Sequence, residues 1–143
     1  MSGNHNSTRN NNIDVLVNDL NLTQLKNSTI FENNDYFVLS PSVQNKKNWF
    51  DLRKVNLDKF LKEKKGILLI RLLNDFILVD LRKFTRELID DNPYITENSG
   101  IHWKFQITES LDNKKYIFNT KSKKRFYIEV ISKDKLKESI NYC

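Results

Sequence analysis

The apolar positions separate a polar beginning from a series of short helices and strands. Residues 1–12 hold one apolar residue, Met1, and five asparagines. Such a segment cannot offset the entropy of ordering the chain, so we expect a disordered tail there and a single domain over 13–143. The next apolar residues recur at the spacing of one helix face: Ile13, Leu16, Val17 and Leu20. They predict a short helix, with Asn12 as its N-cap.

The most apolar part of the chain predicts a β-hairpin at the centre of the fold. Two apolar runs, 67–73 and 76–79, flank a polar pair that is typical of a two-residue turn. Neither run alternates with polar residues, so both faces of the hairpin should be buried. Arg71 places a charge in this segment. We expect a structural partner for it, such as Asp75 or Asp80, and a functional role is the alternative.

One capping pattern recurs three times and predicts three helices. In each case a polar N-cap residue has an apolar residue before it and another within the first helical turns, as in a hydrophobic staple. The caps are Asn56, Asp80 and Ser132. The first of these helices should span about 57–64 and end at Gly66, where a helix C-terminal glycine belongs.

The remaining apolar runs predict strands. Segments 36–39 and 48–52 are short strands, and 115–119 pairs with 125–131 around a polar loop. Segment 102–108 alternates strictly. One set should face the core, namely Trp103, Phe105 and Ile107, and the other the solvent, namely His102, Lys104, Gln106 and Thr108. The order of elements predicts the α+β class, with an antiparallel-rich sheet and two or three helices packed on one side.

Charge changes this picture by pointing to an anionic partner. The chain of 143 residues has a formal net charge of +6. Residues 101–143 hold ten basic and five acidic side chains, so most of the excess lies in the last third. Nucleic acid or an acidic protein surface is therefore the expected partner. The single cysteine, Cys143, and the lack of an apolar run of 18 residues favour a cytoplasmic protein without a membrane partner.

Several kinds of active site are excluded by what the sequence lacks. Two histidines, one cysteine and three isolated glycines provide neither a zinc site nor a phosphate-binding loop, so we expect no cofactor, metal or catalytic residue. A metal-dependent nuclease needs clustered carboxylates near a lysine. The acid-x-Lys spacing occurs at Glu63–Lys65 and Asp112–Lys114, outside predicted strands, and Arg82 stands where a lysine should follow Asp75 and Asp80. An atypical or degenerate nuclease is therefore the third hypothesis.

The strongest positive feature is a basic, aromatic hairpin over 114–127, which holds six basic and four aromatic residues. A basic β-ribbon can bind nucleic acid, so we expect a non-catalytic module for duplex DNA, contacted mainly through its backbone. The cations are Lys114, Lys115, Lys121, Lys123, Lys124 and Arg125; secondary contacts are Tyr127, Lys104, His102 and Gln106. The alternative is a solvated hairpin whose lysines protect a sheet edge.

A rival hypothesis is a small protein-interaction module, such as an inhibitor or accessory subunit of a phage, mobile element or defence system. It would use an apolar patch around Trp49 or the helix at 13–20. We expect Trp49 to pack in the core beside Phe50, with stacking or partner anchoring as the alternative. The run 49–53 before a helix and a buried hairpin is loosely similar to strand-rich domains that accompany restriction and defence enzymes, and no diagnostic residue marks a family.

Overall fold

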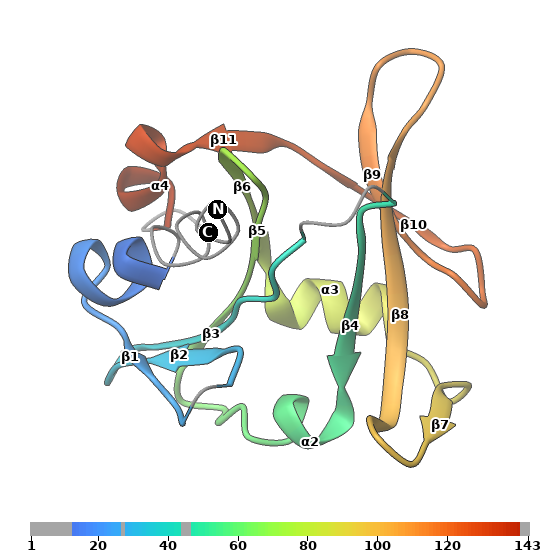
Figure 1. The fold of residues 1–143 in the computed structure, drawn as a ribbon, viewed down its shortest axis with the longest axis horizontal. Helices are drawn as coiled ribbons and strands as arrows, with labels where there is room; N and C mark the ends of the chain where they lie inside the picture. Colours follow the sequence, from blue (N-terminus) through green and yellow to red (C-terminus); the bar gives the residue numbers. More distant parts are fainter. Residues whose placement is uncertain (1–12, 27, 44–46, 141–143) are drawn as a thin grey trace, which may run out of the picture.

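Two β-sheets face each other across a helix (Figure 1). The computed structural model describes residues 13–26, 28–43 and 47–140, and the tail predicted over 1–12 lies outside these ranges. The first sheet has the strand order β1-β2-β3-β5-β6-β11. Its strands are β1 Thr23–Gln24, β2 Ile30–Glu32, β3 Tyr36–Leu39, β5 Lys65–Arg71, β6 Asp75–Asp80 and β11 Val130–Ser132. All neighbours are antiparallel except β3 and β5.

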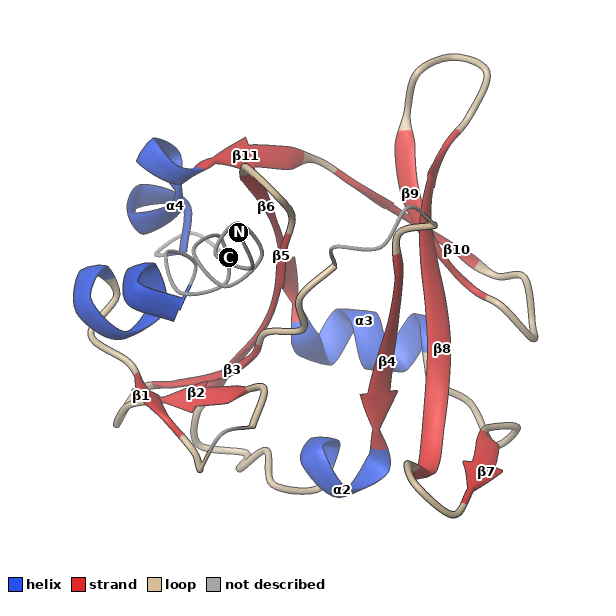
Figure 2. Cartoon of the chain, viewed as in Figure 1, coloured by secondary structure: helices blue, strands red, loops and turns tan. Residues whose placement is uncertain are grey.

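The second sheet has the order β10-β9-β8-β4, and β7 also pairs with the beginning of β8. Its strands are β4 Trp49–Arg53, β7 Tyr94–Thr96, β8 Gly100–Glu109, β9 Lys115–Asn119 and β10 Arg125–Ile128. Every pairing in this sheet is antiparallel. The helices are η1 Val15–Asp19, α2 Lys54–Leu57, α3 Leu81–Leu88 and α4 Lys133–Ile140. Figure 2 shows the sheets on either side of α3.

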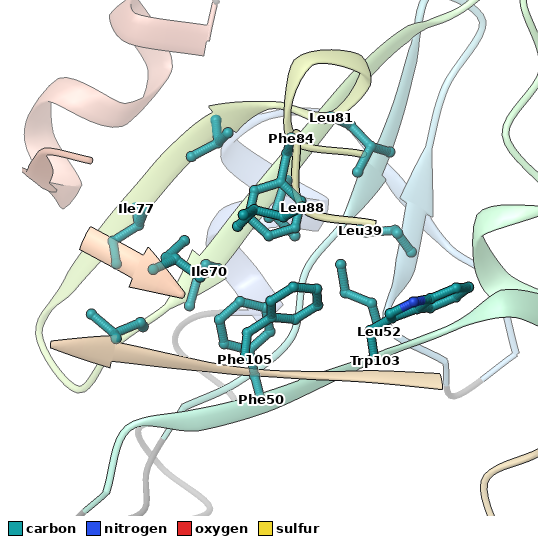
Figure 3. Packing of buried hydrophobic residues seen from close by; sticks show 14 of the residues in the cluster. Leu39, Phe50, Leu52, Ile70, Ile77, Leu81, Phe84, Leu88, Trp103 and Phe105 are labelled. Atoms are coloured by element: carbon teal, nitrogen blue, oxygen red, sulfur yellow. The ribbon is translucent and has the colours of Figure 1, made fainter. Parts of the chain in front are cut away.

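The main core fills the space between the two sheets. Phe84 of α3 packs edge-on against Phe105 of β8, with ring centroids 5.1 Å apart, and Phe105 stacks on Phe50 of β4 (Figure 3). A second core lies on the opposite face of the first sheet, where η1 and α4 bury Leu16 and Leu136. Burial of these apolar side chains is the main force that holds the layers together.

The α+β class is confirmed, and the predicted strands are divided between two sheets. Helices cover both faces of the first sheet rather than one, because β5 and β6 are apolar on both sides. Leu68 and Ile70 enter the core under α3, whereas Ile67 and Leu69 enter the core under η1 and α4.

The central hairpin is confirmed, with its turn at Leu73–Asn74, one residue earlier than the predicted polar pair Asn74–Asp75. Ile70 of β5 lies opposite Ile77 of β6, and the Leu72 amide donates to the Asp75 carbonyl at 2.9 Å. Arg71 is 4% exposed, and its Nη2 donates to the carbonyl oxygen of Ser40 at 2.9 Å. This partner is a backbone oxygen, whereas the partner expected from the sequence was a carboxylate.

The helix predicted over 57–64 is wrong. Helix α2 spans Lys54–Leu57, so Asn56 lies inside it and is not its cap. Gly66 belongs to buried strand β5, where the Phe60 ring lies against its Cα and occupies the space of a side chain. The same ring stacks on Phe37 at 5.2 Å. The glycine therefore serves ring packing and does not terminate a helix.

The other predicted helices are present. The Asp80 carboxylate accepts a hydrogen bond from the Lys83 amide at 3.2 Å, which confirms it as the N-cap of α3. Ser132 directly precedes α4. The first helix is a π-helix that buries Val15 and Leu16 and leaves Val17 36% exposed, because its wider turn rotates the apolar face. No helix in the described ranges is long and apolar enough to cross a membrane.

Candidate nucleic-acid interface

The second sheet turns one face toward the core and the other away from it. Alternation along each strand produces this division. The inward residues include Phe50, Leu52, Trp103, Phe105, Ile107 and Ile117, all of which belong to the main core. Cross-strand register places the alternate positions together on the other side, which we call the outer face: Trp49, Asp51, Arg53, Tyr94, His102, Lys104, Gln106, Thr108, Tyr116, Phe118, Arg125 and Tyr127.

Aromatic rings are the most conspicuous part of the outer face. Tyr127 is 55% exposed and Trp49 is 40% exposed, while Tyr94, Tyr116 and Phe118 are half-buried. The prediction that Trp49 packs in the core is therefore wrong. The buried tryptophan is Trp103, whose Nε1 donates to the Asp90 carbonyl at 3.1 Å. Several large rings gathered on one solvated sheet face make that face a candidate binding surface.

Cationic side chains lie over these rings. The Arg125 guanidinium is 4.5 Å from the Tyr116 centroid, and the Lys121 ammonium is 4.6 Å from that of Tyr94. Longer contacts join Lys123 to Phe118 and Lys47 to Trp49, each at 5.7 Å. Cation–π attraction therefore holds positive charge beside four outer-face rings.

Arg125 contacts two tyrosines at the edge of the sheet. Its pKa is raised above the ordinary value, first by the hydrogen bond that it shares with Tyr127 and then by the electrostatic effect of Tyr116. These two tyrosines lie directly opposite each other on β9 and β10, with ring centroids 5.5 Å apart. Arg125 and the two rings thus form one cluster at the free edge of the sheet.

Asn119 fixes the loop that carries the other cations. Its side chain is buried, and its carbonyl oxygen accepts hydrogen bonds from the amides of Lys121 at 2.9 Å and Ser122 at 3.2 Å. Its amide nitrogen donates to the Leu88 carbonyl at the end of α3, at 2.9 Å. The loop 120–124 is therefore anchored to the domain although Lys121, Lys123 and Lys124 are exposed.

The structure brings together only part of the predicted basic hairpin. Lys121, Lys123, Lys124 and Arg125 lie in or beside the loop after β9. Lys114 immediately precedes β9 and Lys115 is its first residue, so both lie at the opposite end of the strand from the loop (Figure 1). The strand separates Lys115 from the loop by roughly 13 Å at about 3.3 Å per residue. There the Lys114 ammonium faces the Asp112 carboxylate at 4.0 Å, and both lysines border a groove between the sheets.

The polar side of β8 also differs from its prediction. His102 was expected to face solvent, but it is 1% exposed because β7 folds beside it. Its Nδ1 lies 2.9 Å from the Gly100 carbonyl oxygen, and its ring stacks on Tyr94. His102 is therefore a structural residue. Lys104 remains accessible at the outer face, with its ammonium 5.7 Å from the Tyr94 centroid.

Gln106 has a positioning role. Its side-chain amide donates to the Lys47 carbonyl at 2.9 Å, and its backbone lies opposite Trp49 and Phe118. This contact attaches the segment before β4 to the middle of the outer face. It also commits one donor of a side chain that was expected to make a secondary contact with nucleic acid.

Sequence reasoning missed several members of this surface. Arg53 and Tyr94 come from β4 and β7, and Lys47 comes from the segment before β4. The signal for Arg53 is visible in the sequence, since Trp49, Asp51 and Arg53 alternate with the apolar Phe50 and Leu52. Nothing local indicated that β4 pairs with β8, however, because Arg53 and its partner His102 are 49 positions apart in the sequence. Between them the chain passes through the first sheet.

The carboxylates considered for a nuclease do not meet. Asp75 and Asp80 stand at the two ends of β6, roughly 16 Å apart at about 3.3 Å per residue. One divalent ion cannot bridge that distance. Among the residues that the structure describes, no group of three or more His, Cys, Asp or Glu is placed to hold a metal ion.

The apolar face of the helix predicted at 13–20, considered as a surface for a protein partner, packs against the domain. Val15 and Leu16 are buried in the second core, so the apolar face of this helix is already used in folding.

Comparisons of the chain with known protein families, curated proteins and solved structures gave no match.

Proposed function

We propose that this protein binds nucleic acid through the outer face and the adjoining loop 120–124. The observation that carries the proposal is the convergence of cations from distant parts of the chain. Arg53, Lys104 and Arg125 lie on the strands of the outer face, against the single carboxylate of Asp51. The loop adds three exposed lysines: Lys121, Lys123 and Lys124.

Such a surface suits a polyanion. Neutralising phosphates releases condensed counterions, and this release provides much of the affinity of proteins for nucleic acids. The loop lysines are exposed, so binding phosphate costs them little desolvation. The anchor at Asn119 holds the loop in one position before binding, which reduces the entropy lost on association.

Fluorescence anisotropy at several salt concentrations tests this function. Labelled duplex DNA, single-stranded DNA and RNA are titrated with wild-type protein and with the double variant K123E/K124E. We expect weaker binding by the variant on every probe. The slope of log affinity against log salt should fall by about 0.9 per lost duplex phosphate contact, or about 0.7 for a single strand.

A matched control separates a local site from overall charge. The variant K133E/K135E reverses two exposed lysines of α4 and changes the net charge by the same amount. Helix α4 packs on the opposite side of the first sheet, away from the outer face (Figure 1). If both double variants lose affinity equally, the outer face has no special part in binding. If wild-type protein binds none of the probes at low salt, the proposed function is wrong.

A protein partner is the second candidate, and the exposure of Trp49 favours it. Exposed tryptophan is enriched among the residues that dominate protein interfaces. An acidic protein surface would complement the same cations. Retention of one defined protein after nuclease treatment and a high-salt wash, with loss of that protein in Trp49→Ala, would support this function over nucleic-acid binding.

A further inference from the structure

The geometry points to a narrower ligand: we propose that the outer face binds unpaired nucleic acid, with bases stacked on Tyr127 and Trp49 and phosphates held by the surrounding cations. This inference rests on the proposed function and names its substrate class. The two rings are the most exposed aromatic groups of the outer face, at 55% and 40%. Aromatic rings on sheets bind bases that have been released from pairing and stacking.

The rings distinguish single strands from duplexes. In a duplex, neighbouring base pairs already cover the faces of each base, so an aromatic side chain gains nothing from them unless the base is flipped out. Phosphate contacts are made by cations, hydroxyl groups and amides, and the face of an aromatic ring contributes little to them. A surface that served only a duplex backbone would therefore not require Tyr127, Trp49 and the partly exposed Phe118.

The width of the surface leads to the same conclusion. Trp49, Gln106, Phe118 and Arg125 form one row across four neighbouring strands. At about 4.8 Å between strands, the row is roughly 14 Å wide before side chains are added. The major groove of B-DNA is about 12 Å wide and admits a two-stranded ribbon, so this four-stranded face does not fit inside it.

The row also fixes how bases and phosphates alternate. Trp49 and Phe118 are two strand spacings apart, roughly 10 Å, with Gln106 between them. The Lys47 ammonium lies over the Trp49 ring and the Lys123 ammonium over the Phe118 ring, each 5.7 Å from the ring centroid. A base that stacks on either ring displaces the ammonium, and the long, exposed lysine side chain then reaches a neighbouring phosphate. At the sheet edge, Arg125 provides the same pairing with Tyr116 and Tyr127.

The direct test replaces the rings and keeps the charges. Tyr127→Leu and Trp49→Leu remove the stacking surface, whereas the matched controls Tyr127→Phe and Trp49→Phe keep a ring. The probes are labelled 20-mers of oligothymidylate and oligouridylate and a 20-base-pair duplex, with inorganic polyphosphate as a competitor that has phosphates and no bases. Thermal unfolding confirms that each variant is folded.

We expect single strands to bind at least about tenfold more tightly than the duplex at the same salt. Each Leu variant should lose roughly tenfold in single-strand affinity, while the Phe variants stay within about threefold of wild type. Duplex and polyphosphate binding should change little in all four variants. Comparison of the two single strands shows whether the ligand sugar is deoxyribose or ribose, and preference for either supports the proposal.

Failure of this inference is distinguishable from failure of the proposed function. If the Leu variants bind single strands as wild type does, and salt-dependent binding to all polyanions persists, stacking is absent although nucleic-acid binding stands. Tighter binding of the duplex than of both single strands would also overturn the inference. If no probe binds and K123E/K124E has no effect, both proposals are wrong.

Discussion

The side-chain amide of Asn119 donates a hydrogen bond to the backbone carbonyl of Leu88 at 2.9 Å, joining the end of β9 to the end of α3. Helix α3 is the layer between the two sheets, so this bond ties the exposed loop 120–124 to the centre of the domain. The same side chain accepts hydrogen bonds from two loop amides. One buried residue therefore determines where the loop lysines stand.

Asn119→Ala should destabilise the protein and loosen the loop. The substitution removes three hydrogen bonds and leaves the buried Leu88 carbonyl unsatisfied, so we expect the free energy of unfolding to fall by about 1–3 kcal/mol. Urea denaturation measures the loss. Ser122→Ala is the control, because Ser122 accepts one exposed hydrogen bond from the Lys124 amide, and its removal should cost under about 0.5 kcal/mol. Equal stability of the two variants would contradict the anchoring role.

Gly66→Ala should be costly because of a single ring. A methyl group at this position would overlap the Phe60 side chain, which stacks on Phe37. Overpacking of this kind lowers the free energy of unfolding by about 1–3 kcal/mol. Phe60→Leu in the same chain should relieve part of the clash, so a double-mutant cycle should show coupling between the two sites. Strictly additive effects would show that the ring is not the cause.

Asp80→Ala should weaken α3. Loss of the N-cap leaves the Lys83 amide without its side-chain acceptor and should lower the free energy of unfolding by about 0.5–2 kcal/mol. Asp80→Asn keeps a capping oxygen and should retain most of the stability. Chemical denaturation of the three proteins provides the comparison, and an Asn variant as unstable as the Ala variant would rule out capping as the explanation.

Acid should weaken one contact in the turn between β8 and β9. The Ser110 hydroxyl donates to the Asp112 carboxylate and lowers the pKa of that group below 3.8, its ordinary value. Because the native pKa is depressed, the contact favours the folded state above the ordinary pKa and is lost as pH falls through the native pKa.

Ser110→Ala should therefore raise the Asp112 pKa toward its ordinary value, as measured by NMR titration of the carboxyl group. Lys114→Ala is a suitable control, since the Lys114 ammonium is exposed and 4.0 Å from the carboxylate. An unchanged Asp112 pKa in Ser110→Ala, or an equal rise in the control, would contradict the assignment.

The sequence by itself determined the features that depend on neighbouring residues. The hairpin of β5 and β6, the alternation along β8 and the Asp80 cap follow from apolar spacing and from hydrogen bonds within a few residues. The α+β class follows from the order of these elements. The basic loop 120–124 was also found in this way, because its flanking strands are adjacent in the chain.

Only the tertiary structure decided which surfaces those elements share. Alternation divides a strand into two faces, but the choice between Trp49 and Trp103 for the core depends on the layer that packs against them. His102 is buried by β7, and β9 separates Lys115 from Lys121 by its own length. These relationships arise from pairing between distant segments, whose closure is driven by burial of the common core rather than by any local pattern.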